Sequence, residues 1–307
     1  MRRAALAIAL MLPAASAAHA QTAARCDRAC LSALADRYMD ALVAKTPQKL
    51  PWADVVRFSE NSVPMMIGDG LWASSTAHSA RPLIAADPRS GTVAWFGTVE
   101  EHGQPAFYAM RMKVEGGRIA EVESVVRRKQ GRPPFGAPET FALDSSLAER
   151  LPEKARLPRE RMVSLVEGYF NGVALNDGTL YTRFDPGCAR TENGVTVTSG
   201  GQGASAFAQG CEAQFRLGLF RAVDRVRARR LAIVDEERGI VVALGTSDYG
   251  ARTQAFTTTD GRPFAAPTTY PHSQGFVTIF KLGEAGIRRV DEFASELPYL
   301  MPPPFKE

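Results

Sequence analysis

Two glutamates occupy matching places in this sequence, and each is followed by an asparagine. Residues 59–61 (Ser-Glu-Asn) match residues 191–193 (Thr-Glu-Asn) at an offset of 132. Glu60 and Glu192 each end a predicted strand, where a carboxyl group in an apolar pocket can pass a proton to or from a substrate. A structural interpretation is also open, because a Glu-Asn pair can end a strand and hydrogen-bond the following loop.

Two histidines are the candidate acid–base partners of these glutamates. His78 lies in an irregular stretch, and His272 precedes a predicted strand after a long loop rich in Pro and Thr, so both positions can reach the mouth of a pocket. His102 lies in a predicted hairpin turn and is explained as a solvated tip. The candidate catalytic residues are therefore Glu192, His272, Glu60 and His78. No third ligand accompanies the histidines, and the sequence predicts neither a metal site nor a cofactor.

The sequence does not contain the motifs of three other kinds of site: a dinucleotide site, a nucleophile elbow and a phosphate-binding loop. The glycine-rich run at residues 200–203 neither follows a clear strand nor opens a helix with a paired acid, so it does not support a dinucleotide site. Residues 203–207 (Gly-Ala-Ser-Ala-Phe) lack the closing glycine of a nucleophile elbow, and the sequence has no phosphate-binding loop. Acid–base chemistry is therefore the reaction type that the candidate residues support.

The elements that would position these residues occur twice. The helical patterns around Tyr38 and Tyr169 match at an offset of 131, and residues 91–98 match residues 239–246. The order of the matches is constant while the offset grows to 168, so the second copy has longer loops. The sequence therefore predicts two similar domains in a tandem repeat.

The first twenty residues have the pattern of a secretory signal peptide. Arg2 and Arg3 precede an apolar run at residues 4–12, and residues 18–20 (Ala-His-Ala) form a small-residue cleavage site. The run is shorter than the roughly 20 apolar residues that cross a bilayer, so no membrane span is predicted. Without residues 1–20 the chain has 35 Lys and Arg against 33 Asp and Glu, which predicts no nucleic-acid partner. We expect a periplasmic or secreted protein.

Four cysteines in an exported chain indicate two disulfides. Cys188 and Cys211 both lie in the second copy, and a bridge between them would stabilise the fold by roughly 3 kcal/mol on the chain-entropy model. A bridge between Cys26 and Cys30 is tight but possible. Zinc is the alternative, without a Cys-x-x-Cys or His-x-His grouping to favour it.

Each copy is predicted to have one helix followed by strands. The helices are expected at residues 31–43 and 162–173, and a first strand near residues 55–58 precedes about twenty irregular residues. The remaining strands follow period-two patterns bounded by turn residues, at 92–100, 106–114 and 118–127 in the first copy and at 231–234, 240–247, 276–282 and 287–293 in the second.

A helix, an irregular middle and an antiparallel meander form an α+β arrangement. With this plan seen twice, the sequence resembles the nuclear transport factor two-like superfamily, which contains SnoaL-like cyclases, ketosteroid isomerases and scytalone dehydratase. Four segments look like an exported, tandem-duplicated SnoaL-like family of unassigned reaction: residues 26–31, 57–61, 68–72 and 298–302.

The resemblance implies two tandem cone-shaped SnoaL-like domains, each a curved antiparallel sheet wrapped on N-terminal helices. The predicted domains are residues 21–129 and 159–296, each with its own core. A Pro-rich linker, residues 130–158, is expected on the surface of one domain, and an apolar Pro-rich tail, residues 297–307, is expected to pack against a domain.

Enzymes of this superfamily place one or two polar side chains in an apolar cone, which implies cofactor-independent acid–base chemistry. The expected function is an isomerase, a lyase or dehydratase, or a cyclase for a small apolar or carbonyl- or hydroxyl-bearing molecule. The second copy is the preferred site because longer loops can close around His272. The alternative is a non-catalytic protein that binds a small ligand or a partner, and a homo-oligomer is open in either case.

Overall fold

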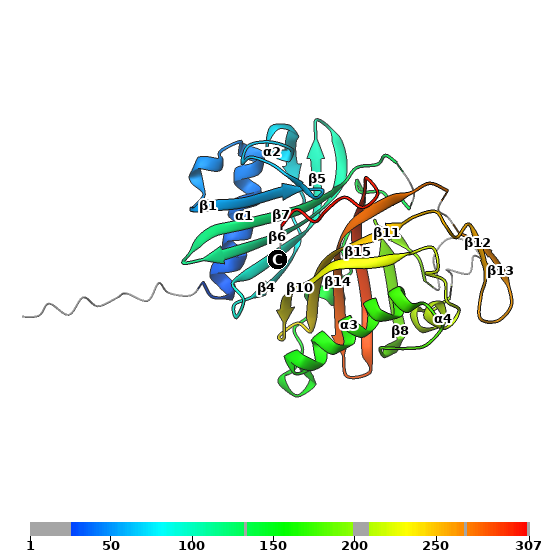
Figure 1. Cartoon of the computed structure of the whole chain (residues 1–307). Helices are drawn as coiled ribbons and strands as arrows, with labels where there is room; N and C mark the ends of the chain where they lie inside the picture. The colour runs from blue at the N-terminus through cyan, green and yellow to red at the C-terminus, as the bar shows by residue number, and fades with distance from the viewer. Residues whose placement is uncertain (1–25, 132–133, 199–208, 267–268, 306–307) are drawn as a thin grey trace, which may run out of the picture.

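The computed structural model describes residues 26–131, 134–198, 209–266 and 269–305. The predicted signal peptide, residues 1–20, lies outside the described residues. Figure 1 shows two sheets side by side, each curving over one long helix, with the C-terminal segment between them. The predicted α+β fold with two sheet-based halves is confirmed.

The first half is built on α1 (Arg28–Ala44). The helix begins where the Asp27 side chain accepts a hydrogen bond from the Cys30 amide at 2.8 Å, and it ends at Lys45 with φ 57°. Its apolar face is buried against the sheet. The other elements of this half are β1 (Trp52–Glu60), β2 (Val63–Pro64), α2 (Leu71–Ser74), β3 (Ser75–His78), β4 (Leu83–Asp87), β5 (Thr92–Glu101), β6 (Gln104–Glu115) and β7 (Arg118–Arg127).

The second half repeats this plan on α3 (Arg159–Leu175), which ends at Asn176 with φ 48°. A short hairpin, β12 (Ala255–Thr257) with β13 (Pro263–Ala265), extends from it. The remaining elements are β8 (Phe184–Glu192), β9 (Val195–Thr196), α4 (Cys211–Arg216), β10 (Arg225–Asp235), β11 (Ile240–Tyr249), β14 (His272–Gly283) and β15 (Gly286–Leu297).

Both sheets have the predicted antiparallel meander with one parallel addition. In the described chain the strand orders are β2-β1-β7-β6-β5-β3, with β4 also on β5, and β10-β11-β14-β15-β8-β9. The first long strand of each half, β1 or β8, pairs in parallel with the last strand, β7 or β15. The stretch expected to be irregular contains β3 and β4, because its short strands lack a long alternating pattern.

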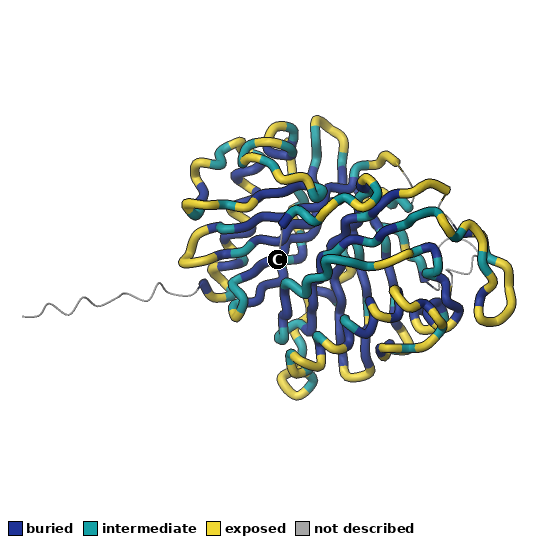
Figure 2. Tube along the Cα trace, viewed as in Figure 1, coloured by how far each residue is buried: buried dark blue, intermediate teal, exposed yellow. Residues whose placement is uncertain are grey.

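The inner face of each sheet packs on its helix and forms a separate apolar core. The outer faces, which point away from the helices, pack on each other and form a third core shared by both halves, and Figure 2 shows buried backbone across both sheets. The buried members of this shared core are Leu83, Ala85, Ala94, Phe96, Phe107, Ala109, Val125, Leu147, Ile233, Ile240, Val242, Leu244, Val277, Ile279 and Phe293.

Charged pairs also join the halves around the shared core. Arg28 contacts Asp235 at 2.6 Å, Arg159 contacts Asp87 at 2.6 Å and Arg230 contacts Glu123 at 2.6 Å. The acidic partner in each pair is buried, so separating the halves would leave it without its counter-charge. The halves are therefore connected by both apolar and ionic contacts.

The middle of the linker contacts both halves. Leu147 is buried in the shared core, and the Phe141 ring packs 5.0 Å from Phe107 and 5.6 Å from Phe293. The buried Lys281 amino group donates to the Glu149 carbonyl oxygen at 2.8 Å. The apolar residues of the linker explain this placement, since they fill the gap between the two outer faces.

The tail crosses from the second half to the first. The Leu300 amide donates to the Ser273 hydroxyl at 2.9 Å, and Arg227 donates to the Met301 carbonyl oxygen at 2.6 Å. Phe305 is buried, with the Arg57 guanidinium 5.0 Å from its ring. The described part of the tail therefore contacts both halves.

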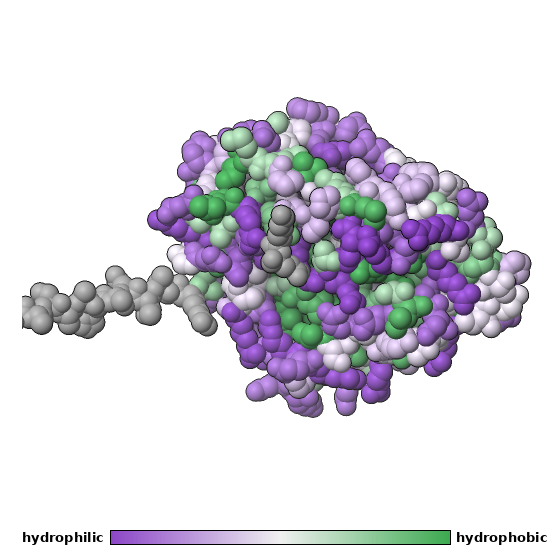
Figure 3. All heavy atoms as spheres, in the orientation of Figure 1, coloured by the Kyte–Doolittle hydropathy of each residue, from purple (hydrophilic) through white to green (hydrophobic). Residues whose placement is uncertain are grey.

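Both disulfides are present, Cys26–Cys30 at the start of α1 and Cys188–Cys211 between β8 and α4. On the face in Figure 3, hydrophobic surface occurs in patches between hydrophilic side chains. In the described part of the chain, no helix is both long enough and apolar enough to cross a membrane.

The shared core makes a testable prediction for stability. Phe293→Ala removes a buried ring that packs against Phe96, Phe107 and Phe141, and we expect the free energy of unfolding of the whole chain to fall by about 3–5 kcal/mol. Urea unfolding measures it. Phe256→Ala, in the β12–β13 hairpin, is the control and should cost about 1 kcal/mol or less. A Phe293→Ala loss as small as that of the control would show that the halves do not depend on this contact.

Candidate functional site

The two asparagines of the repeated Glu-Asn pair have a structural role. Asn61 and Asn193 have φ of 48° and 46°, in the left-handed region that asparagine adopts more readily than most residues. The Asn61 side-chain oxygen accepts from the Val126 amide at 2.9 Å, and the Asn193 oxygen accepts from the Ala294 amide at 2.9 Å. Each asparagine thus extends the pairing with the last strand after its own strand has ended.

Glu60 is held by the backbone of the first half. It is 5% exposed, and its Oε2 accepts from the Leu71 amide at 3.0 Å, at the start of α2. Arg128 lies 3.6 Å from its Oε1. Burial raises the pKa of Glu60, while the Leu71 amide and Arg128 favour the charged form. These contacts favour the structural interpretation for Glu60.

Aromatic rings fill the interior of the first half beside Glu60. The Tyr38 ring centroid lies 5.3 Å from Trp72 and 6.2 Å from Trp52, and Trp95 lies 5.8 Å from Tyr108. Tyr38 is buried, as predicted for a core residue, and burial raises the pKa of its hydroxyl. The inner face of the first sheet is therefore mainly apolar around its glutamate.

Glu192 lies in a different environment. Its side chain is 32% exposed and accepts at 2.6 Å from Arg190, whose side chain is 6% exposed. The other terminal nitrogen of Arg190 donates to the Gln214 side-chain oxygen at 2.5 Å. The Arg190 guanidinium also lies 4.9 Å from the Phe220 ring centroid. Glu192 is thus a carboxylate paired with a buried guanidinium and reached by solvent.

A second carboxyl group, Glu292, stands beside Glu192. The two residues are direct partners in the parallel pairing of β8 with β15, so their side chains share the inner face. The Thr278 hydroxyl donates to Glu292 at 2.8 Å. Burial and the neighbouring Glu192 charge raise the pKa of Glu292 to about 7, against the opposing effects of Thr278 and Arg190. The arrangement can hold one proton near neutral pH.

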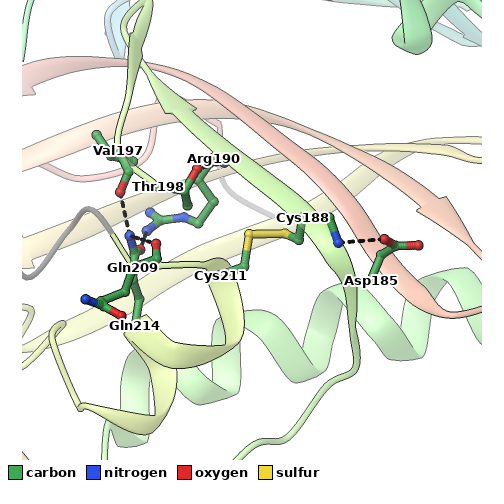
Figure 4. The surroundings of a disulfide bond; sticks show 9 residues. Asp185, Cys188, Arg190, Val197, Thr198, Gln209, Cys211 and Gln214 are labelled. Carbon is green, nitrogen blue, oxygen red and sulfur yellow. Dashed lines mark hydrogen bonds between the residues drawn. A yellow bond between two sulfur atoms is a disulfide. The ribbon is translucent and has the colours of Figure 1, made fainter. Parts of the chain in front are cut away.

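The Cys188–Cys211 disulfide attaches α4 to β8 close to Arg190. Figure 4 shows Gln214 and Arg190 meeting beside the bridge, with Gln214 also bonded to the Val197 and Gln209 backbone oxygens. Gln214 is fully buried. The tyrosine of the repeat, Tyr169, is buried nearby, and burial raises its pKa to about 12 although Arg190 opposes this.

The strand register shows which of these groups the first half lacks. In the first half, Glu60 pairs with Ser124 on the last strand, and Ser124 pairs with Met110 on the strand before it. At the same positions of the second half, Glu192 pairs with Glu292, and Glu292 pairs with Thr278. Two residues before each glutamate, the first half has Phe58 and the second has Arg190. The polar cluster is therefore specific to the second half, and it consists of Arg190, Glu192, Gln214, Thr278 and Glu292.

The structure does not bring His272 to Glu192. His272 begins β14, six residues before Thr278, which places it roughly 20 Å away along the strand. Its ring is buried and stacks on Tyr249 at 4.8 Å, and its Nδ1 lies 3.0 Å from the Tyr270 carbonyl oxygen. Among the contacts of the described residues, none joins His272 to Glu192, and the strand-pair partner of this glutamate is Glu292.

His78 also lies apart from its expected partner Glu60. Its Nε2 is 3.1 Å from an Asp40 carboxylate oxygen, and the Asp40 side chain is largely exposed on α1. The Trp95 ring lies 5.9 Å away at a right angle. Among the contacts of the described residues, none joins His78 to Glu60.

Glu292 and Arg190 were missed by reasoning from the sequence. The signal that could have found them is the parallel pairing of the first and last strands, which sets Glu292 opposite Glu192. Alignment of the two copies gives a second signal. Phe58 and Ser124 in the first half are uncharged, whereas Arg190 and Glu292, at the same positions of the second half, are a basic and an acidic residue.

Two further features bear on ligands. Among the described residues, no group of three His, Cys, Asp or Glu side chains could hold a metal ion. A groove of about 520 Å³ lies in the first half against the linker, and the described residues that line it include none of the four predicted catalytic residues. Its apolar lining comes from Pro82, Leu83, Phe141, Leu143 and Leu147.

Comparison with known proteins identifies the sequence family. The family model described as Domain of unknown function (DUF8021) matches residues 24–126 and 155–294, which together make up most of the chain. The two matched segments correspond to the two halves, as the tandem repeat predicts. No curated protein matches the chain.

Solved structures similar to this chain have the size of one half. An NTF-2 like protein of unknown function from Burkholderia xenovorans LB400 is 11% identical, with a TM-score of 0.28, covering 34% of this chain and 88% of its own. A candidate polyketide cyclase from Xanthomonas campestris pv. campestris is 17% identical, with a TM-score of 0.28, covering 44% and 90%. A candidate ketosteroid isomerase from Kribbella flavida DSM 17836 is 19% identical, with a TM-score of 0.28, covering 43% and 96%.

The raised pKa of Glu292 predicts how stability depends on pH. The folded chain retains this proton between about pH 4.5 and 7 while the unfolded chain releases it, so the wild type loses stability as the pH rises through this range. Glu292→Gln removes the effect, and we expect the variant to gain about 1–3 kcal/mol relative to wild type between pH 5 and pH 8. Urea unfolding at both pH values measures the gain.

The control for this experiment is Glu284→Gln, at the exposed turn between β14 and β15. Its stability relative to wild type should be the same at both pH values. An equal response of the two variants would contradict the assignment of a shared proton to Glu292.

Proposed function

The chain belongs to the family described as Domain of unknown function (DUF8021), and we propose that it is a cofactor-independent acid–base enzyme whose site is the polar cluster of the second half. The reaction class is an isomerase, a lyase or a cyclase acting on a small carbonyl- or hydroxyl-bearing molecule. We also propose export to the periplasm or outside the cell, which the two disulfides support.

The observation that carries the proposal is the pair of adjacent carboxyl groups with unequal surroundings. Glu192 accepts a charge-assisted hydrogen bond from Arg190 at 2.6 Å. Glu292 is held by the Thr278 hydroxyl and has a pKa raised to about 7 by burial and by the Glu192 charge. Two adjacent carboxyl groups in different environments, one of them with a raised pKa, are suited to the roles of base and acid.

These surroundings assign a role to each group. Glu192 is assigned the role of base, because Arg190 donates a charge-assisted hydrogen bond to it and its side chain is 32% exposed. Glu292 is the acid, because it retains a proton that it can donate to a carbonyl or hydroxyl oxygen of the substrate. Arg190 stabilises the negative charge at Glu192 and is a positioning residue in this scheme.

The apolar residues around the cluster support the proposed class of substrate. Phe215 and Phe220 lie 4.9 Å apart, and Tyr169 lies 5.0 Å from Phe215. An apolar surrounding weakens competition from water, so a carboxyl group there acts more strongly on a bound carbonyl. A small apolar molecule with one carbonyl or hydroxyl group fits this combination of groups.

A second candidate function is non-catalytic binding of a small apolar ligand. The groove beside Phe141 and Leu147 favours it, because apolar side chains form much of its lining. Binding there is independent of Glu192 and Glu292, so substitutions in the carboxyl pair distinguish the two functions.

The catalytic proposal predicts unequal effects of matched substitutions. We expect Glu192→Gln and Glu292→Gln to lower the rate by about 10²- to 10⁴-fold, because each removes a proton-transfer group while keeping its shape. The measurement is deuterium incorporation from heavy water next to the carbonyl group of small ketones and aldehydes, followed by NMR.

The matched control is Glu60→Gln, at the same place in the first half. Because Glu60 bonds the α2 backbone, this variant should have a lower Tm and the wild-type rate. If all three variants keep the wild-type rate, the carboxyl pair does not carry the reaction and the proposed site is wrong. A wild-type rate equal to that of buffer for the whole panel would count against carbonyl substrates.

A further inference from the structure

We propose that Gln214 is a positioning residue of the carboxyl pair, which holds Arg190 against Glu192 and is itself held in place by the Cys188–Cys211 disulfide. This inference rests on the proposed function, because it concerns the same pair of carboxyl groups. It assigns a role to Gln214, a member of the polar cluster to which the proposed reaction gives none.

The contacts of Gln214 fix it at both ends of its amide. Its oxygen accepts from Arg190 at 2.5 Å, and its nitrogen donates to the Val197 oxygen at 2.5 Å and to the Gln209 oxygen at 3.2 Å. The residue is fully buried. A buried amide with its oxygen and its nitrogen both bonded has one favourable orientation, and that orientation presents the oxygen to Arg190.

The disulfide and the Gln214–Arg190 bond are neighbouring connections between the same two elements. Gln214 lies three residues after Cys211 on α4, and Arg190 lies two residues after Cys188 on β8, so each pair shares one face of its element. The Cα atoms of the two cysteines are 5.8 Å apart. Figure 4 shows both connections in one view.

The short helix needs this attachment. α4 spans six residues, which is far below the length at which an isolated helix is stable in water. It therefore depends on packing and on the covalent bond to β8 for its position. Without the disulfide, the Gln214 oxygen has no covalent constraint that keeps it beside Arg190.

The position of the Arg190 guanidinium affects the two carboxyl groups through its charge. Arg190 is 5% exposed, so a displaced guanidinium would lose its partners without regaining full hydration. Its charge favours the ionised form of Glu292, and this effect weakens as the guanidinium moves away. Loss of the Gln214 contact should therefore raise the pKa of Glu292.

The test measures the titration of Glu292 directly. The protein is labelled with ¹³C at the glutamate side-chain carboxyl, its signals are followed from pH 4 to 9, and the signal absent in Glu292→Gln is the assigned one. We expect Gln214→Leu and the double variant Cys188→Ser/Cys211→Ser each to raise the midpoint by about half a pH unit or more. The matched control, Cys26→Ser/Cys30→Ser, should keep the wild-type midpoint, because that bridge lies at the start of α1.

A third form of the protein covers failure of a variant to fold. Folded wild type is treated with a dithiol, which reduces Cys188–Cys211 to two thiols and becomes a cyclic disulfide itself, and the same titration is recorded. A wild-type midpoint in Gln214→Leu, or equal shifts in both cysteine double variants, would overturn the proposal. If Gln214→Leu, the Cys188 and Cys211 double variant and the reduced protein all unfold, the contacts are structural and the proposal also fails.

The proposed function fails by a different measurement. A wild-type rate in Glu292→Gln would refute the catalytic proposal and leave the titration of Glu292 as it is. A wild-type midpoint in Gln214→Leu would refute the positioning role and leave the catalytic proposal standing.

Discussion

The apolar contact between the outer faces of the two sheets is the interaction on which the rest of the molecule depends. Each sheet has a helix on its inner face, and without the other half its outer face would expose rings such as Phe107 and Phe293. The linker and the tail follow from this contact, since Leu147 fills the space between the faces and Phe305 reaches back to the first half. Duplication here produced one packed unit in which each copy covers the other.

The parallel pairing of the first and last strands sets the position of the glutamates within this unit. Left-handed Asn61 and Asn193 extend that pairing, so the preceding glutamate always faces inward at the end of the sheet. The repeated Glu-Asn pair is thus explained by the backbone, and its conservation between the copies says nothing about chemistry. The chemistry depends on what surrounds each glutamate.

Much of the fold could be predicted from the sequence, because the long strands have strong period-two patterns and the copies support each other. β7 has the predicted bounds, the Cys188–Cys211 disulfide is present as predicted, and the Cys26–Cys30 bridge, which the sequence left open, is also formed. The short strands β3 and β4 were missed because so few residues have no distinct period. Of the four predicted candidates, Glu192 belongs to the polar cluster. Glu292 reaches it through strand pairing, which local patterns do not contain, and Arg190 lies two residues before Glu192 on β8.

Comparing the two copies shows that the fold does not require the polar cluster. The first half builds the same sheet and helix with Phe58, Ser124 and Met110 at the positions of Arg190, Glu292 and Thr278. The fold is therefore satisfied by apolar or neutral residues there, and burying a guanidinium beside two carboxyl groups carries a desolvation penalty that apolar packing avoids. The fold does not require this cluster, and the cluster combines the groups that the proposed proton-transfer site would use.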